Sequence, residues 1–181
     1  MRVITGTARG RKLAALEGLE VRPTTDMVKE AMFSIIQFEV EGANVLDLFA
    51  GSGQLGIEAL SRGARFCVFV DSSRDSQNIV RQNLQTTGLA KQSRVAAMDY
   101  GAFLRSTGEV FDIALLDPPY GKGLLQEAPP LLAPRMSPGG AILCESPRGE
   151  ALPEKAGGFR IKKTYSYGKI ALTLYRRPEE E

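Results

Sequence analysis

Four consecutive residues in the second half of the chain, Asp117-Pro118-Pro119-Tyr120, place a carboxylate, two rigid residues and a phenol directly after the apolar run 113–116. The Asp117 carboxylate and the Pro118 carbonyl can accept both protons of an exocyclic amino group on a nucleobase. Both prolines lack a backbone N–H and have a fixed φ, so these acceptors are preorganised. Tyr120 can stack on the base. The motif predicts group transfer to a base amine, which must be unpaired or flipped out of its stack.

The chain of 181 residues contains no histidine and only two cysteines. This composition removes Ser-His and Cys-His nucleophile pairs and most zinc sites, so no metal is expected. Cys67 and Cys144 lie inside apolar, strand-like runs, where buried reduced thiols of a cytoplasmic protein are expected. Any reaction must therefore rely on carboxylates, backbone groups, a tyrosine or a cofactor.

A glycine-rich turn supplies the second candidate site. Gly51, Gly53 and Gly56 form a G-x-G-x-x-G pattern after an apolar run, with Ala50 and Ser52 in the same turn. Glycine allows a tight turn and close approach of a ligand to the backbone. The pattern alone fits an NAD enzyme, an S-adenosylmethionine (SAM) enzyme or a plain strand-to-helix turn.

Acids at three expected strand ends support a nucleotide site, and two of them favour SAM over NAD. Asp71 ends the second strand and can accept hydrogen bonds from both ribose hydroxyls of either cofactor. Asp47 precedes the glycines, where a carboxylate opposes a pyrophosphate but can hold the cation of a methionine moiety. Asp99 ends the third strand and can accept the adenine amino group; the alternative is a helix cap before Tyr100.

The order of elements predicts how these residues meet. Val28, Ala31, Met32, Ile35 and Ile36 predict an amphipathic helix capped by Thr24 or Thr25. Beyond it, strands alternate with helices, which predicts a doubly wound, mostly parallel sheet with ligands at the carboxyl ends of its strands. The expected strands are 44–49, 65–71, 94–99, 111–117 and 141–146, then two antiparallel strands within 159–177 joined near Tyr167-Gly168; the expected helices are 54–62, 74–85 and 100–105, and 126–134 is expected to be a loop or broken helix.

Positive charge is concentrated at the two ends of a chain whose net charge is +2. Residues 1–14 alternate around Gly6 and Gly10, which predicts a hairpin. A second basic segment covers 160–177. The N-terminal cations, Arg2, Arg9, Arg11 and Lys12, are candidate RNA contacts, the alternative being a solvated surface.

The chain resembles the bacterial SAM-dependent methyltransferases that modify guanine N2 of 16S ribosomal RNA, of the guanine-966 type. The resemblance rests on MRVITGTARGRKL, RPTTDMVKEAMF, DLFAGSGQLGIEALSRGA, DPPY and YSYGKIALTLYRR. It implies a Rossmann-like sheet of seven strands with the last strand antiparallel, preceded by a basic hairpin over 1–22, with 23–181 forming the methyltransferase domain. It also implies that Arg22, Pro23 and Thr24 close over the cofactor, and that the partner is 16S RNA or an assembling small subunit.

Three departures from the family pattern are visible. Asp71 stands where the family more usually has glutamate, and three prolines interrupt 126–134. The N-terminal basic cluster is also thin, so we expect RNA binding to need the C-terminal basic strands or the assembled particle. The alternative functions are a DNA adenine-N6 methyltransferase, which shares DPPY, and an RNA-binding protein without catalysis. We expect a monomer without membrane contact, since no run approaches eighteen apolar residues.

Overall fold

The computed structural model describes residues 1–16 and 25–179. Within them lies one eight-stranded sheet in the order β3-β2-β1-β4-β5-β8-β7-β6. The strands from β3 to β5 are parallel, and β8, β7 and β6 continue the sheet with antiparallel pairing. The strands are β1 (Asn44–Asp47), β2 (Phe66–Asp71), β3 (Ser93–Ala97), β4 (Phe111–Leu116), β5 (Met136–Pro147), β6 (Lys155–Ala156), β7 (Phe159–Tyr167) and β8 (Ile170–Arg176).

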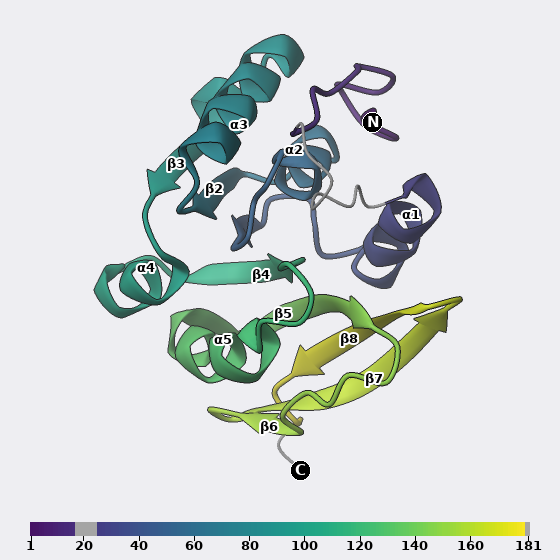
Figure 1. The fold of residues 1–181 in the computed structure, drawn as a ribbon, viewed down its shortest axis with the longest axis vertical. Helices are drawn as coiled ribbons and strands as arrows, with labels where there is room; N and C mark the ends of the chain where they lie inside the picture. Colours follow the sequence, from purple (N-terminus) through teal and green to yellow (C-terminus); the bar gives the residue numbers. More distant parts are fainter. Residues whose placement is uncertain (17–24, 180–181) are drawn as a thin grey trace.

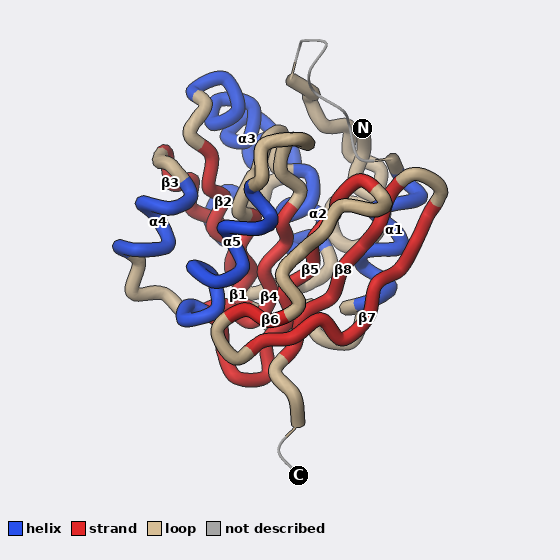
Figure 2. The backbone as a smooth tube through the Cα atoms, turned by 60° about the horizontal axis from the view of Figure 1, so that its bottom comes forward, coloured by secondary structure: helices blue, strands red, loops and turns tan. Residues whose placement is uncertain are grey.

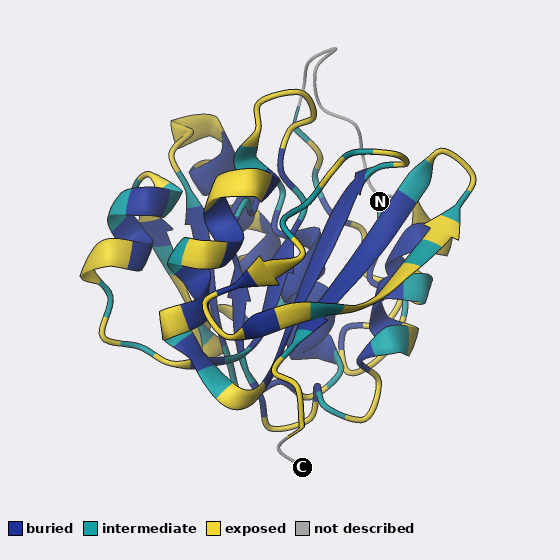
Figure 3. Cartoon of the chain, turned by 90° about the horizontal axis from the view of Figure 1, so that it is seen from below, coloured by how far each residue is buried: buried dark blue, intermediate teal, exposed yellow. Residues whose placement is uncertain are grey.

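Helices cover both faces of this sheet (Figure 1). One hydrophobic cluster joins the sheet to α1 (Asp26–Ile35), α2 (Gln54–Ser61) and α3 (Arg74–Thr87). The other joins its opposite face to α4 (Tyr100–Ser106) and α5 (Leu124–Leu132). The central strands are consequently buried on both faces (Figure 3), which explains why their sequences are continuously apolar.

The predicted doubly wound sheet with an antiparallel last strand is confirmed, but two details differ. The sheet gains an eighth strand, because the short β6 pairs with the start of β7. The loop or broken helix expected at 126–134 is wrong, because α5 continues through Pro129 and Pro130. Proline fixes φ near its helical value, and burial of Leu125, Ala128 and Leu132 against the sheet outweighs the lost backbone donors.

Two helix boundaries follow local rules. Thr25 caps α1 by accepting a hydrogen bond from the Val28 N–H at 3.3 Å, as one of the two predicted threonines. Gly88 ends α3 in the left-handed conformation, with φ at 73°. None of the described helices is long and apolar enough to cross a membrane.

The N-terminal segment, residues 1–14, returns on itself and packs against α2 (Figure 2). The predicted hairpin is reduced to one isolated antiparallel bridge between Arg2 and Lys12. Regular strands do not form because α2 takes the intervening backbone donors: Thr7 N–H and Ala8 N–H donate to the Ser61 carbonyl and hydroxyl at 2.8 and 3.0 Å. As a result, every residue of α2 is buried, between the sheet on one side and this segment on the other.

Candidate active site

The predicted motifs meet at one edge of the sheet, as expected for parallel strands. Asp47 ends β1 and Asp71 ends β2, while residues 117–120 directly follow β4. Because β1 pairs with both β2 and β4, this edge is where the strand order reverses. Ligands of doubly wound sheets bind at such a switch point.

The glycine turn has the conformation that its sequence predicts. Gly51 and Gly53 have φ of 58° and 81°, and open space surrounds the Cβ position of Gly51. A ligand can therefore lie against bare backbone at Gly51. Gly56 has another role, because a Cβ there would lie 2.3 Å from the Phe69 ring and 2.7 Å from the Cys67 sulfur. The third glycine thus lets α2 pack closely on β2.

Asp71 holds this turn in place. Its Oδ2 accepts a hydrogen bond from the Gly51 N–H at 2.9 Å, and its Oδ1 accepts one from the Ser73 N–H at 2.9 Å. The glycine turn also closes on itself, with the Gly53 N–H donating to the Ala50 carbonyl at 2.7 Å. Each carboxylate oxygen has a second lone pair with which to accept a ribose hydroxyl.

Asp47 lies beneath the turn and is buried. Its Oδ2 accepts a hydrogen bond from the Gly56 N–H at 3.0 Å. Burial raises the pKa of Asp47 to about 7, and the nearby Asp71 charge adds to that increase, whereas the Gly56 hydrogen bond opposes it. Near neutral pH, such a buried carboxyl group can be protonated or ionised. A neighbouring cation would stabilise the ionised form.

Gln54, the first residue of α2, was not anticipated. Its side-chain Oε1 is buried and has no hydrogen-bond partner within the described part of the chain. Unpaired buried acceptors are rare, and each calls for an explanation such as a catalytic role or a bound water or ion. Bare glycine backbone and a carboxyl suited to a cation fit the amino-acid end of SAM, and Gln54 directly follows this turn.

The DPPY motif lies beside a buried acid that sequence reasoning missed. The Tyr120 hydroxyl donates to Oε1 of Glu145 at 3.0 Å, and Glu145 is fully buried in β5. Because Leu116 of β4 pairs with Cys144, the next residues along the two strands, Asp117 and Glu145, are neighbours. An acid after the apolar run 141–144 was a visible signal, since Asp47 and Asp117 also follow apolar runs.

Asp99 lies two residues beyond β3 and is exposed. Its Oδ2 accepts a hydrogen bond from the Ala102 N–H at 3.1 Å, so it caps α4, the alternative role considered for it. A role toward adenine stays a prediction. The predicted cofactor contacts Arg22 and Thr24, with Pro23, lie outside the described residues.

Asn83 of α3 connects the glycine turn to the N-terminal segment. Its Nδ2 donates to the carbonyls of Ser52 and Ala14 at 2.9 and 3.0 Å, and its Oδ1 accepts the Ala14 N–H at 2.8 Å. Asn83 is buried. No local pattern signals this role, because both partners are distant in sequence.

The predicted RNA-binding residues all lie on the N-terminal segment. Arg9, Arg11 and Lys12 are exposed. Arg2 is exposed too, but its Nε lies 3.3 Å from Oδ2 of Asp26, so part of its charge is balanced. The structure groups these cations on one segment without testing whether they contact RNA.

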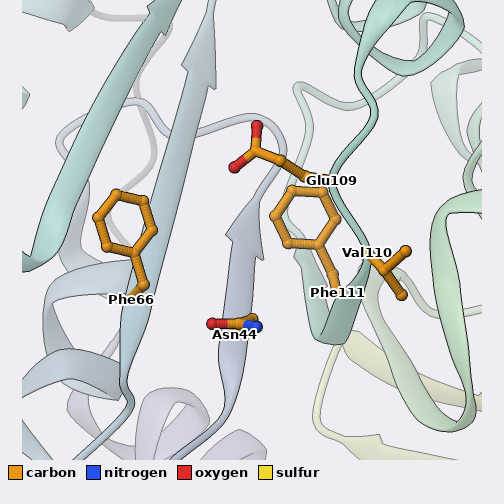
Figure 4. A pocket seen from close by; sticks show the side chains of 5 residues that line it. All are labelled: Asn44, Phe66, Glu109, Val110 and Phe111. Carbon is orange, nitrogen blue, oxygen red and sulfur yellow. The ribbon is translucent and has the colours of Figure 1, made fainter.

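A pocket of about 170 Å³ lies elsewhere. Asn44, Phe66 and Phe111, which begin β1, β2 and β4, line it with Glu109 and Val110 (Figure 4). It therefore opens at the amino ends of the strands, opposite the predicted motifs. No group of three or more acids or cysteines suited to a metal occurs among the described residues.

Comparison with known proteins gives a consistent result. The family described as Conserved hypothetical protein 95 matches residues 1–176. Ribosomal RNA small subunit methyltransferase D of Escherichia coli is 35% identical, over 98% of this chain and 90% of its own length, and its Haemophilus influenzae counterpart is 34% identical, over 97% and 93%. YlbH of Bacillus subtilis is 40% identical over 98% of this chain and 99% of its own.

Solved structures agree with the fold. The Escherichia coli methyltransferase yhhF superposes with a TM-score of 0.87 at 36% identity, covering 98% of this chain and 97% of its own. An RNA methyltransferase of Salinibacter ruber, solved with S-adenosyl-L-homocysteine, gives 0.69 at 18% identity over 88% of this chain and 96% of its own, which supports the fold alone.

Proposed function

The chain belongs to the Conserved hypothetical protein 95 family, and on this basis we propose that it transfers a methyl group from SAM to the exocyclic N2 amine of a guanine in small-subunit ribosomal RNA. It is a SAM-dependent methyltransferase acting on ribosomal RNA, in line with relatives named for that activity that match it over nearly its whole length. The observation that supports the choice of an amine is the juxtaposition of the DPPY motif and the glycine turn at the switch point of the sheet.

Each group of this site has a proposed role. The glycine turn and Asp47 hold the methionine part of SAM, with Asp71 on the ribose and Asp99 toward the adenine. SAM supplies a methyl group on a sulfonium; when this methyl is transferred, the C–S bond breaks, the sulfur leaves as a neutral thioether that needs no acid, and the methylated nitrogen loses one proton. Asp117 and the Pro118 carbonyl accept the two N–H groups of the guanine amine and orient its nitrogen. Pro119 stiffens the loop, and Tyr120 stacks on the base.

Labelled SAM tests the proposal with three acceptors: unmodified small subunits, naked small-subunit RNA and adenine-containing duplex DNA. We expect label in RNA, and mass spectrometry should assign it to guanine N2. Comparing particle with naked RNA identifies the form of the substrate. Label confined to DNA would establish the adenine-N6 alternative. None of the relatives described above supports that alternative.

Asp117→Ala separates binding from transfer. Because Asp117 is proposed to orient the amine and not to hold SAM, we expect turnover to fall at least roughly a hundredfold, as for loss of a preorganised polar group in an active site. The dissociation constant for SAM, measured by calorimetry, should change less than about threefold. Full turnover by Asp117→Ala would contradict this role and point to another acceptor for the amine.

A further inference from the structure

The basic residues of the C-terminal segment are distributed along one hairpin, from Arg160 near the start of β7 to Lys169 in the turn before β8. β7 runs antiparallel to β8, and β8 runs antiparallel to β5, so β7 and β5 point the same way. Pro147, Ile170 and Tyr167 are consecutive partners across these three strands. The β7–β8 turn therefore lies at the edge of the sheet that carries the DPPY motif, where the chain also leaves β5 (Figure 2).

Three cations lie close to the tyrosines at this end of the hairpin. Lys169 lies in the turn, and its carbonyl accepts the Arg148 N–H at 2.8 Å, which brings Arg148 alongside. Lys163 lies with its Nζ 4.7 Å from the centre of the Tyr165 ring. We call Arg148, Lys163, Tyr165, Tyr167 and Lys169 the tip cluster. Its three cations are exposed, and the acid nearest to Arg148 along the chain is Glu150.

The two tyrosines face the active-site side. Tyr165 and Tyr167 are half-buried and pack against the cluster of α1, α2 and α3. Tyr165 pairs with Leu172, which pairs with Glu145, the partner of the Tyr120 hydroxyl. Two strand spacings, about 10 Å, separate the backbones of Tyr165 and Glu145. Tyrosine rings thus continue outward from the motif along one face of the sheet.

Protection of β7 against pairing with a strand of another chain explains only part of this arrangement of cations and tyrosines. The middle of β7 has β8 as its one strand partner among the described residues, and its side chains are exposed or intermediate (Figure 3). Lysines on such a strand discourage pairing with another chain. The tyrosines do not serve that purpose. Cations interleaved with half-exposed rings are the surface that unpaired nucleotides bind, through phosphate contacts and stacking.

We propose that the tip cluster is an RNA-contact surface that binds unpaired nucleotides flanking the methylated base. The inference rests on the proposed RNA substrate and deepens it. The base must leave its stack to reach Asp117, which exposes the stacking faces of its neighbours at the moment of transfer. One of them stacks on Tyr167, while Lys169 and Arg148 neutralise phosphates. The N-terminal cations contact the RNA on the other side of the site.

The other end of the hairpin offers a matched control. Arg160 and Lys162 are exposed cations near the start of β7, where Arg176 is already held by Glu39 through two contacts of 2.6 Å. The pair Arg148→Glu with Lys169→Glu changes the net charge as much as the pair Arg160→Glu with Lys162→Glu. The long-range attraction between protein and RNA therefore falls equally in the two double variants. A direct contact with RNA is lost only in the variant of the tip cluster.

The test measures the dissociation constant of unmodified small-subunit RNA, naked and assembled, over a salt series. We expect the tip pair to bind at least tenfold more weakly and to reduce the salt slope by about 1.4, the loss of two single-strand phosphate contacts. The control pair should keep the wild-type slope. Tyr167→Ala should weaken binding roughly five- to hundredfold, whereas Tyr167→Phe should not. Thermal unfolding and SAM affinity verify that each variant is folded.

Two outcomes would overturn the proposal. In the first, wild-type protein methylates RNA but the tip pair binds RNA with wild-type affinity and slope. In the second, the control pair loses as much as the tip pair, so that overall charge explains the effect. Failure of the proposed function looks different, because the wild-type protein itself would then leave RNA unlabelled.

Discussion

At the scale of single residues, Asp47 makes folding sensitive to pH. Its pKa is about 7 in the folded protein against an ordinary value of 3.8, because burial disfavours the charged form. Below pH 4 both states are protonated, so the group imposes no cost. As pH rises from about 4 to 7, the unfolded chain ionises first and stability falls. Each pKa unit corresponds to about 1.4 kcal/mol, so the decrease is on the order of a few kcal/mol.

Asp47→Asn should remove this decrease, because the amide does not ionise and can still accept the Gly56 N–H. Urea unfolding of both proteins between pH 4 and pH 8 measures the difference. We expect the variant to gain stability relative to the wild type as pH rises. Parallel pH curves for the two proteins would show that Asp47 ionises normally.

Substitution can separate the hydrogen bond of Tyr120 from its proposed role in stacking on the base. Tyr120→Phe keeps the ring for stacking but removes the hydrogen bond to Glu145, so we expect a loss of stability of about 1–3 kcal/mol and a minor change in kcat/KM. Tyr120→Ala also removes the ring and should lower kcat/KM roughly tenfold or more. Equal kcat/KM losses in both variants would instead assign the essential role to the hydroxyl.

At the scale of elements, α2 connects the glycine turn to the N-terminal segment through a buried carboxylate. Glu58 accepts the N–H groups of Ile4 and Thr5 at 2.8 and 3.0 Å, pairs with Arg62 at 2.9 Å, and lies 3.6 Å from the Lys29 ammonium. Lys29 is fully buried, and burial lowers its pKa despite the nearby Glu58 charge. The helix α2, which begins at the glycine turn, therefore also anchors the N-terminal segment.

Glu58→Gln leaves the Lys29 ammonium buried without its counter-charge. We expect a loss of about 3–5 kcal/mol in the free energy of unfolding, as for other broken buried pairs. Glu30→Gln is the matched control, since Glu30 is an exposed acid of α1 and its loss should cost less than about 0.5 kcal/mol. Chemical denaturation measures both, and a Glu58→Gln value as small as the control's would show that the pair contributes little.

The sequence predicted what depends on local pattern. Apolar runs indicated the strands β1, β2 and β4. The residues at the end of each run were predicted to lie at one edge of the sheet, because the carboxyl ends of parallel strands meet there and no tertiary contact has to be known. Asn83 was missed because its partners lie 31 and 69 residues away. Glu145 follows an apolar run and was visible as a strand-end acid, but its contact with Tyr120, 25 residues away, depends on the pairing of β4 with β5. The helix over 124–132 was missed because two prolines suppress its local propensity, while burial of its apolar face decides its structure.

At the scale of the whole molecule, the net charge is only +2, yet two basic surfaces lie on different parts of the chain. Arg9 and Arg11 lie on the N-terminal segment that packs on α2, whereas the tip cluster lies on β7, on the β7–β8 turn and directly after β5. The DPPY motif follows β4, which lies in the sheet between β1 and β5. An RNA strand that delivers a base to this motif would thus be held from two separate elements.

This arrangement predicts additive effects on binding. Arg9→Glu with Arg11→Glu should weaken RNA binding roughly tenfold at 100 mM salt and leave SAM affinity unchanged, because the exposed guanidinium groups neutralise phosphates alone. Combined with the tip pair, the losses should add within about 0.5 kcal/mol, as for distant sites without shared partners. A combined loss no larger than either single loss would mean that RNA engages one surface only after binding the other. The four dissociation constants of this cycle, at one fixed salt concentration, distinguish two independent contacts from one coupled clamp.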